Sequence, residues 1–136
     1  MAAVEGYTQK VFELEVCSSF SAAHAILMHG EREPLHGHDW HVEVLVGCDG
    51  LDAEGLACDF HALERALAEV VTPFRSRNLN ETAPFDRINP TAEHVARHIA
   101  QEMARRIERP LTIRRVRVTE APGCAARYHP AERGAA

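Results

Sequence analysis

The chain has 136 residues, of which 46% are hydrophobic and 26% are charged, and its formal net charge at pH 7 is -5. This composition excludes a disordered protein and predicts one globular domain over residues 1–136. Because the net charge is negative and Lys and Arg are scattered, we expect no nucleic-acid partner. We also expect no signal peptide and no membrane association, since no segment has the length of an apolar span.

The cysteines lie far apart in the sequence, and no two of them form a Cys-x-x-Cys pair. They are Cys17, Cys48, Cys58 and Cys124. This spacing favours neither a disulfide framework nor a zinc ribbon. Reduced thiols are typical of cytoplasmic proteins, and we expect that location here.

The first regular pattern is "VFELEVCSSF", residues 11–20, in which hydrophobic and polar side chains alternate. Phe12, Leu14 and Val16 share one face and the glutamates share the other, which predicts a half-buried strand. If the alternation continues without a bulge, His24 lies on the hydrophobic face.

A second alternating segment is "HGHDWHVEVLVG", residues 36–47. His36 and His38 share a face with Trp40 and three valines, whereas His41 lies on the opposite face. Two histidines therefore point toward the predicted core. The segment "MHGEREP" before it contains Gly, Pro and charged residues, which predicts a loop or a hairpin.

Two helices are predicted in the second half of the chain. Asp59 can cap the first, "FHALERALAEVV", and Pro73 ends it. Its apolar stripe comprises Phe60, Leu63, Leu67, Val70 and Val71. Thr91 can cap the second, which Pro110 ends. Its apolar positions are Val95, Ile99, Met103 and Ile107. The polar segment between the helices, residues 75–90, is predicted to be a surface loop.

The last predicted strand is "LTIRRVRVTE", residues 111–120, which places Val116, Val118 and Glu120 on one face. A carboxylate in register with valines is unfavourable unless it meets a partner or a ligand. A weaker strand signal covers residues 55–58. This order of elements predicts an α+β domain with an antiparallel sheet.

Five of the nine histidines lie between His24 and His41. His24, His36 and His38 can form a three-histidine set on one face, which suits zinc and leaves a fourth position open for water or substrate. The alternative, histidines that form hydrogen bonds within the core, stays open. His29, in the predicted loop, and His41 are weaker candidates.

Five segments carry a resemblance to a known family: "FSAAHAI", "LHGHDWHVEV", "CDFHALE", "NPTAEHVARHI" and "VRVTEAPGCAARYH". In order and spacing they resemble the 6-pyruvoyl-tetrahydropterin synthase family, which includes 6-carboxy-tetrahydropterin synthase. The resemblance covers about residues 12–129.

The resemblance implies a T-fold, in which an antiparallel four-stranded sheet has two helices packed on one face. It also implies a homo-hexamer, a dimer of trimers with active sites between subunits. The family's zinc ligands correspond to His24, His36 and His38, and the glutamate that anchors the pterin ring corresponds to Glu120. Thr91 resembles a further part of the substrate pocket, and its role as a helix cap stays open beside this one.

The chain departs from the family's best-known members at the catalytic cysteine, which precedes His-Gly-His by four residues. Arg32 stands there. A variant subgroup has Glu-x-x-His-Gly-His, and "EPLHGH" matches it with Glu33. That subgroup resembles enzymes that cleave the side chain of dihydroneopterin triphosphate to give 6-hydroxymethyl-dihydropterin. Glu33 is therefore the candidate general base, the alternative being an ordinary charged loop residue.

The family's Asp-His-x-x-Leu-Asn motif appears here as "RSRNLN". Arg75 and Ser76 replace its Asp-His dyad, and neither can relay protons as that dyad does. Arg32, Arg75 and Arg77 either provide positive charge for an anionic substrate tail or are solvated loop residues.

Together these observations predict a zinc-dependent lyase that acts on the side chain of a dihydropterin, with Zn²⁺ as cofactor and a small molecule as partner. Because fold and zinc do not determine the substrate, two alternatives stay open. One is a divergent member that cyclises, dehydrates or eliminates from a non-pterin metabolite. The other is a non-catalytic, zinc-containing homologue that binds a ligand.

Overall fold

Two thirteen-residue strands, β1 (Phe12–His24) and β4 (His36–Cys48), form the centre of the computed structural model, which describes residues 11–131. They pair antiparallel along their whole length, and every second side chain faces the core. No bulge interrupts the pairing of β1 with β4. The predicted alternation is therefore confirmed as far as His24.

The sheet continues on both sides of this central pair. β6 (Thr112–Ala121) pairs with β4, and β7 (Cys124–Tyr128) pairs with β6, both antiparallel. The two-residue strand β5 (Arg77–Asn78) runs parallel to β1, so the strand order is β5-β1-β4-β6-β7. The predicted antiparallel sheet is thus confirmed, with β5 as a short parallel addition at its edge.

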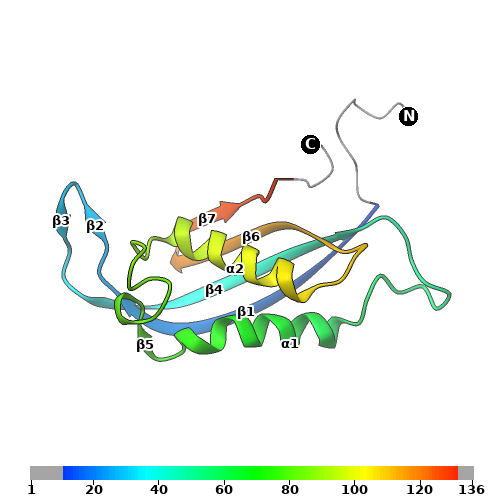
Figure 1. The fold of residues 1–136 in the computed structure, drawn as a ribbon, viewed down its shortest axis with the longest axis horizontal. Coiled ribbons are helices and arrows are strands. Elements are labelled where there is room, and N and C mark those ends of the chain that lie inside the picture. Colours follow the sequence, from blue (N-terminus) through cyan, green and yellow to red (C-terminus); the bar gives the residue numbers. More distant parts are fainter. Residues whose placement is uncertain (1–10, 132–136) are drawn as a thin grey trace.

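Two helices, α1 (Phe60–Val71) and α2 (Ala92–Arg106), cover one face of the sheet (Figure 1). Asp59 caps α1 by accepting a hydrogen bond from the His61 N–H at 2.8 Å. Phe60, the first residue of the helix, is 51% exposed. The buried stripe therefore begins one turn later than predicted.

Residues 75–90 pack more closely on the core than a surface loop would. They contain β5 and the 3₁₀ helix η2 (Leu79–Glu81), and a second 3₁₀ helix, η1 (Thr72–Phe74), precedes them. Leu79 and Phe85 are buried, and the Phe85 ring lies 5.4 Å from that of Phe74. The prediction of a surface loop is wrong in part, because two isolated apolar residues carry no periodic signal.

Residues 55–58 form no strand, contrary to the weak sequence signal. Asp52 explains the difference. Its carboxylate accepts hydrogen bonds from the N–H groups of Glu54 and Leu56, at 2.8 and 3.0 Å. This local bonding stabilises a turn in competition with a strand.

The predicted hairpin between the central strands is present and consists of β2 (Leu27–Met28) and β3 (Glu31–Arg32). His29 and Gly30 form its turn with positive φ angles of 52° and 82°. Two positive φ angles match the right-handed twist of a two-residue hairpin. The hairpin extends from one end of the sheet (Figure 1).

Within residues 11–131, no helix is both long and apolar enough to cross a membrane.

Candidate metal centre

Three histidines converge at one end of the central strand pair. His24 lies directly opposite His36 in the register, and His38 lies opposite Ala22. Strand alternation places all three side chains on the same face of the sheet as Trp40. The ring centroids of the three histidines lie 4.7 to 5.2 Å apart.

The outer nitrogens of two of these rings are directed by backbone carbonyls. Nδ1 of His24 lies 2.8 Å from the Pro90 oxygen, and Nδ1 of His36 lies 2.9 Å from the Pro34 oxygen. Because a carbonyl only accepts, Nδ1 of each ring carries the proton. In the neutral ring Nε2 then presents a lone pair, which is how histidine ligands of metals are commonly oriented.

Two inner nitrogens of the centre have no hydrogen-bond partner, although both lie near Glu120. Nε2 of His24 and Nε2 of His38 are both buried and unpaired, and the His24 side chain is fully buried. Burial also lowers the pKa of His38, although the nearby carboxylate of Glu120 acts in the opposite direction. Two buried imidazole nitrogens without a hydrogen-bond partner fit a zinc ion, which would satisfy them.

Glu120 joins the three histidines on the face of the sheet where the alternation of residues 111–120 placed it, and the histidines are the partners that a carboxylate on this face requires. One potential metal-binding atom from each of these four residues lies within 4.8 Å of the other three. Oε1 of Glu120 lies 3.3 Å from Nε2 of His24 and 3.1 Å from Nε2 of His38. The pairing of β6 with β7 shifts register between Thr119 and Ala121. This shift lies on the side of β6 that faces β7, whereas the pairing of β6 with β4 is regular from Val116 to Thr119.

Glu33 lies at the edge of this centre. Its Oε1 is 3.6 Å from Nε2 of His36 and accepts a hydrogen bond from the Ile26 N–H at 3.1 Å. The Glu33 N–H in turn donates to the Ile26 oxygen at 3.0 Å. The structure therefore brings this carboxylate beside a metal-type histidine and also gives it a part in holding residues 25–27.

Two asparagine side chains fix residues 25–27, which connect His24 to the hairpin. The amide of Asn80 accepts from the Ala25 N–H and donates to the Ala25 oxygen, both at 2.8 Å. Asn89 makes the same pair of bonds with Leu27, at 2.8 and 2.9 Å. Each amide thus forms the pair of backbone hydrogen bonds that a residue of a neighbouring strand could form. Sequence analysis did not identify either residue, because nothing local marks such long-range bonds.

Thr91 acts as the N-cap of α2. Its hydroxyl accepts a hydrogen bond from the His94 N–H at 3.1 Å. The neighbouring Pro90 oxygen is the partner of His24, so the start of this helix also supports the metal centre. A contact of Thr91 with substrate stays a prediction.

The three arginines considered above lie in three different surroundings. Arg32 donates to the Ala25 oxygen at 3.0 Å and lines a pocket beside residues 25–27. Arg75 donates to the Ser19 oxygen at 3.0 Å. Arg77 lines a groove between β5, β1 and β4. They do not form one cluster.

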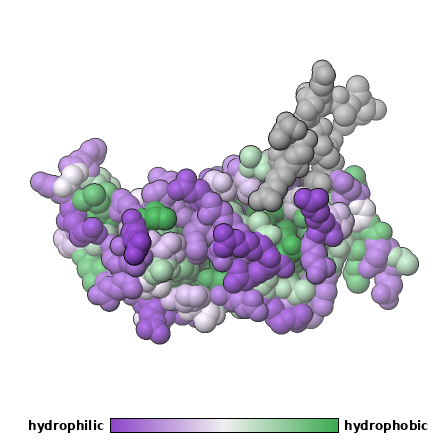
Figure 2. Space-filling model, in the orientation of Figure 1, coloured by the Kyte–Doolittle hydropathy of each residue, from purple (hydrophilic) through white to green (hydrophobic). Residues whose placement is uncertain are grey.

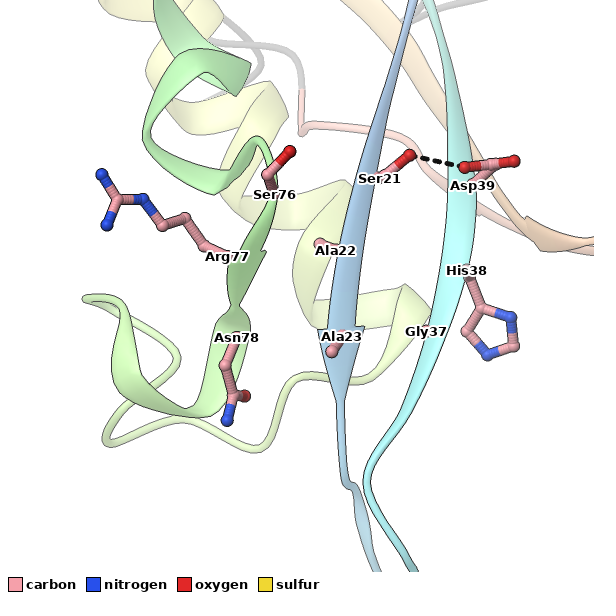
Figure 3. Close-up of a pocket in the computed structure, with 9 residues that line it drawn as sticks. All are labelled: Ser21, Ala22, Ala23, Gly37, His38, Asp39, Ser76, Arg77 and Asn78. Atoms are coloured by element: carbon pink, nitrogen blue, oxygen red, sulfur yellow. Dashed lines mark hydrogen bonds between the residues drawn. The ribbon is translucent and has the colours of Figure 1, made fainter.

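That groove contains Ser76, which stands where the family has the histidine of its dyad (Figure 3). Ser76 has a φ of 55°, and its N–H donates to the Ser21 oxygen at 2.7 Å. Ser21 in turn donates from its hydroxyl to Asp39 at 2.6 Å, while Arg77 extends away from β4 (Figure 3). Positions 75 and 76 therefore offer no acid–base pair.

The remaining candidates lie apart from the centre. His29 is exposed in the turn of the hairpin, and His41 is exposed on the other face of the sheet. Cys17 and Cys58 have a raised pKa, chiefly because burial disfavours the thiolate. Neither thiol belongs to the metal-type group found among the described residues.

Comparison with known proteins gives a family for this arrangement. The family model described as "6-pyruvoyl tetrahydropterin synthase" matches residues 13–131. A relative from Archaeoglobus fulgidus, named putative 6-carboxy-5,6,7,8-tetrahydropterin synthase, is 38% identical over 105 residues, 77% of this chain and 84% of its own. A relative from Pyrococcus furiosus, named dihydroneopterin monophosphate aldolase, is 33% identical over 103 residues, 76% of this chain and 84% of its own.

Solved structures agree on the fold. The 6-pyruvoyl tetrahydropterin synthase of Caenorhabditis elegans superposes with a TM-score of 0.79 at 21% identity, covering 88% of this chain and 96% of that one. A Plasmodium vivax enzyme of the same name superposes with a TM-score of 0.72 at 20% identity, covering 88% and 97%. The fold is therefore the T-fold, and the chain belongs to the 6-pyruvoyl tetrahydropterin synthase family.

Proposed function

We propose that the protein is a zinc-dependent lyase that cleaves the side chain of a phosphorylated dihydroneopterin, releasing 6-hydroxymethyl-dihydropterin. Lyase chemistry on a pterin side chain follows from the family. The observation that supports the more specific proposal is the group of His24, His36 and His38, of which His24 is buried, with Glu33 beside it. Zinc in this group would supply a Lewis acid that acidifies a side-chain hydroxyl.

In this proposal Glu33 and Glu120 have separate roles in the reaction. Glu33 takes the proton from the side-chain hydroxyl. The adjacent carbon–carbon bond then breaks, the oxygen forms an aldehyde, and the electron pair moves to the carbon attached to the ring, where a proton is added. Glu120 accepts hydrogen bonds from the amino and ring N–H groups of the pterin and fixes its orientation.

The names of two similar proteins support this choice of reaction. The Pyrococcus furiosus relative is named as an aldolase of dihydroneopterin monophosphate. The Plasmodium vivax structure is described as a catalytic-residue mutant in which a glutamate is replaced by alanine. A glutamate base and a phosphorylated neopterin are therefore the first combination to test, with both the monophosphate and the triphosphate as substrates.

A second candidate is a reaction on a different metabolite, and the residues at the dyad position favour it. Arg75 and Ser76 stand where the family carries its Asp-His pair, and Arg75 is bonded to the Ser19 oxygen. An elimination or dehydration that needs only zinc and one carboxylate base would suit this site. A homologue that binds a pterin without converting it would keep the same histidines.

We further propose that the chain assembles as a homo-hexamer made of two trimers, with active sites between subunits. Alternate residues of β1, such as Glu15, Cys17 and Ser19, are exposed on the face of the sheet opposite the helices. Hydrophobic residues are also exposed toward the hairpin end, among them Leu27, Met28 and Leu35 (Figure 2). Both surfaces are available to other copies.

The experiment that tests the function is a product assay by mass spectrometry with zinc-loaded protein. Dihydroneopterin monophosphate and triphosphate are supplied separately, and Glu33→Gln is assayed beside the wild type. We expect 6-hydroxymethyl-dihydropterin from the wild type and a turnover at least about 100-fold lower in the variant, the scale of general-base catalysis. Substrate affinity should change little.

Two other outcomes have separate meanings. Equal turnover in Glu33→Gln would remove Glu33 from the mechanism while keeping the reaction. No conversion of either substrate by zinc-loaded protein, with tight binding of a pterin in titration calorimetry, would replace the lyase by a ligand-binding role.

A further inference from the structure

We propose that Glu120 is a fourth ligand of the zinc ion held by His24, His36 and His38, and that it occupies the open coordination position while no substrate is bound. This inference rests on the proposed function, in which the same carboxylate holds the pterin ring. It adds a resting state in which a side chain of the protein fills the coordination position that water or substrate would otherwise occupy.

The distances around Glu120 fit a shared ion. Zinc binds nitrogen and carboxylate oxygen at about 2.0 to 2.2 Å, so two ligand atoms of a tetrahedral site lie roughly 3.3 to 3.5 Å apart. Oε1 of Glu120 lies 3.3 Å from Nε2 of His24 and 3.1 Å from Nε2 of His38. One oxygen atom is thus near ligand-to-ligand distance from two histidine nitrogens at once.

The hydrogen bond of His24 to Pro90 orients the lone pair of its Nε2 toward Glu120. The Nδ1 proton of His24 is used on the Pro90 oxygen, so Nε2 of the neutral ring has only a lone pair. A carboxylate oxygen also has only lone pairs, and two such atoms repel each other at 3.3 Å. A positive charge between them turns this repulsion into attraction.

The same oxygen of Glu120 approaches both histidine nitrogens, at 3.3 and 3.1 Å. Neither Nε2 of His24 nor Nε2 of His38 has a hydrogen-bond partner. A dication satisfies both nitrogens and the oxygen together.

The position of Glu120 in the sheet allows it to leave the metal again. It lies at the irregular part of the pairing between β6 and β7, and its side chain is 27% exposed, whereas that of His24 is fully buried. The histidines therefore form the fixed part of the site and the carboxylate the exchangeable part. Because the amino and ring N–H groups of the pterin would engage both carboxylate oxygens of Glu120, ring binding would compete with zinc for them and open the metal to the substrate's oxygens.

The test measures metal binding rather than activity. Zinc affinity is determined by competition with a chromophoric chelator for the wild type and Glu120→Gln. The matched control is Glu33→Gln, because Glu33 is also a carboxylate beside the histidines, and its amide can still accept from the Ile26 N–H. We expect a loss of at least roughly tenfold in Glu120→Gln, the scale seen when a partner of a metal ligand is removed, and little change in the control.

A second measurement tests directly whether the fourth coordination position of the metal is free. Azide is titrated into the cobalt(II)-substituted proteins and followed in the visible spectrum. We expect weak azide binding in the wild type and in Glu33→Gln, and clearly tighter binding in Glu120→Gln, where the fourth position is free.

The outcomes separate this proposal from the proposed function. Equal zinc affinity and equal azide binding in wild type and Glu120→Gln would overturn the fourth ligand, while the lyase assay above still decides the function. A loss of affinity in Glu33→Gln instead of Glu120→Gln would give the fourth position to Glu33. A wild type that binds no zinc would overturn both proposals.

Discussion

At the scale of single residues, Trp40 connects the core to the metal centre. Its side chain is fully buried, its Nε1 donates to the Ala22 oxygen at 3.2 Å, and its ring lies parallel to that of Phe20 at 6.0 Å. Its ring is also 4.9 Å from that of His24. Trp40 is therefore held rigidly beside the atoms that would bind zinc.

This proximity predicts a fluorescence signal for metal binding. The chain contains one tryptophan, so all tryptophan fluorescence comes from Trp40. We expect cobalt(II), which quenches by energy transfer at short range, to remove most of the emission at one equivalent, while zinc removes little. In His36→Ala the cobalt effect should disappear. Undiminished emission in a cobalt-loaded wild type would place the metal elsewhere.

His98 is a second residue whose surroundings have a measurable consequence. Its ring lies 5.6 Å from that of Phe74 and 5.5 Å from that of Phe85, and burial lowers its pKa, although Glu102 acts in the opposite direction. Below about pH 6.5 the unfolded chain therefore binds a proton more readily than the folded one. Stability from His98 is complete above that pH and is lost as the pH falls.

We expect His98→Gln to flatten this pH dependence. The difference in unfolding free energy between pH 7.5 and pH 5.5, measured with urea in the presence of a metal chelator, should be smaller in the variant. The reduction is at most about 1.4 kcal/mol for each unit by which the pKa is lowered. His61→Gln serves as control because that side chain is 81% exposed. Equal slopes for wild type and His98→Gln would refute the assignment.

At the scale of elements, residues 25–27 are held by side chains on one side and by the backbone of β3 and Glu33 on the other. Asn80 and Asn89 each make two hydrogen bonds to their backbone, and Arg32 donates to the Ala25 oxygen. Because this connection follows His24 directly, its rigidity also fixes one of the metal-type residues.

We expect Asn80→Ala to lower the free energy of unfolding by about 1 to 3 kcal/mol, since it leaves the partly buried N–H of Ala25 unpaired, while the Ala25 oxygen keeps its hydrogen bond from Arg32. Asn89→Ala, whose bonds to Leu27 are exposed, should cost less. Zinc affinity should fall with Asn80→Ala as well. Urea unfolding and chelator competition measure the two effects, and equal stability of both variants and wild type would contradict the account.

Thr91 gives a prediction that separates its two possible roles. Thr91→Ala should destabilise the protein by about 1 kcal/mol through the lost cap, whereas Thr91→Asp should keep the stability, because aspartate caps helices well. Thermal or urea unfolding measures this difference. If Thr91→Asp nevertheless raises KM in the lyase assay, the hydroxyl also contacts substrate. A Thr91→Ala protein as stable as wild type would show that the cap has no energetic role.

At the scale of the whole molecule, the alternation of hydrophobic residues predicted the faces of the central strands. It did not predict which segments far apart in the sequence pack against one another. The alternation in β1 and β4 places His24, His36 and His38 together because two strands of strict period meet without a bulge. The small residues of β7 ("CAARY") show no such alternation. The contacts of Glu120 with His24 and His38 join three strands, and the hydrogen bonds of Asn80 span 55 residues.

Some departures from the family could be identified from single sequence positions, whereas others required the fold. The absence of a cysteine before His-Gly-His and of the Asp-His pair was evident from single positions, and the structure places Glu33 beside His36 but no acid–base pair at positions 75 and 76. The separation of Arg32, Arg75 and Arg77 required the fold, because each belongs to a different element or connection.

The measurement that tests the central claim most directly is the zinc content of purified protein, determined by native mass spectrometry after dialysis against trace zinc. We expect one zinc ion per chain in the wild type and none in His38→Ala, with the fold of that variant confirmed by circular dichroism. A wild type without zinc, or a folded His38→Ala that keeps its full zinc content, would contradict a metal centre built from these histidines.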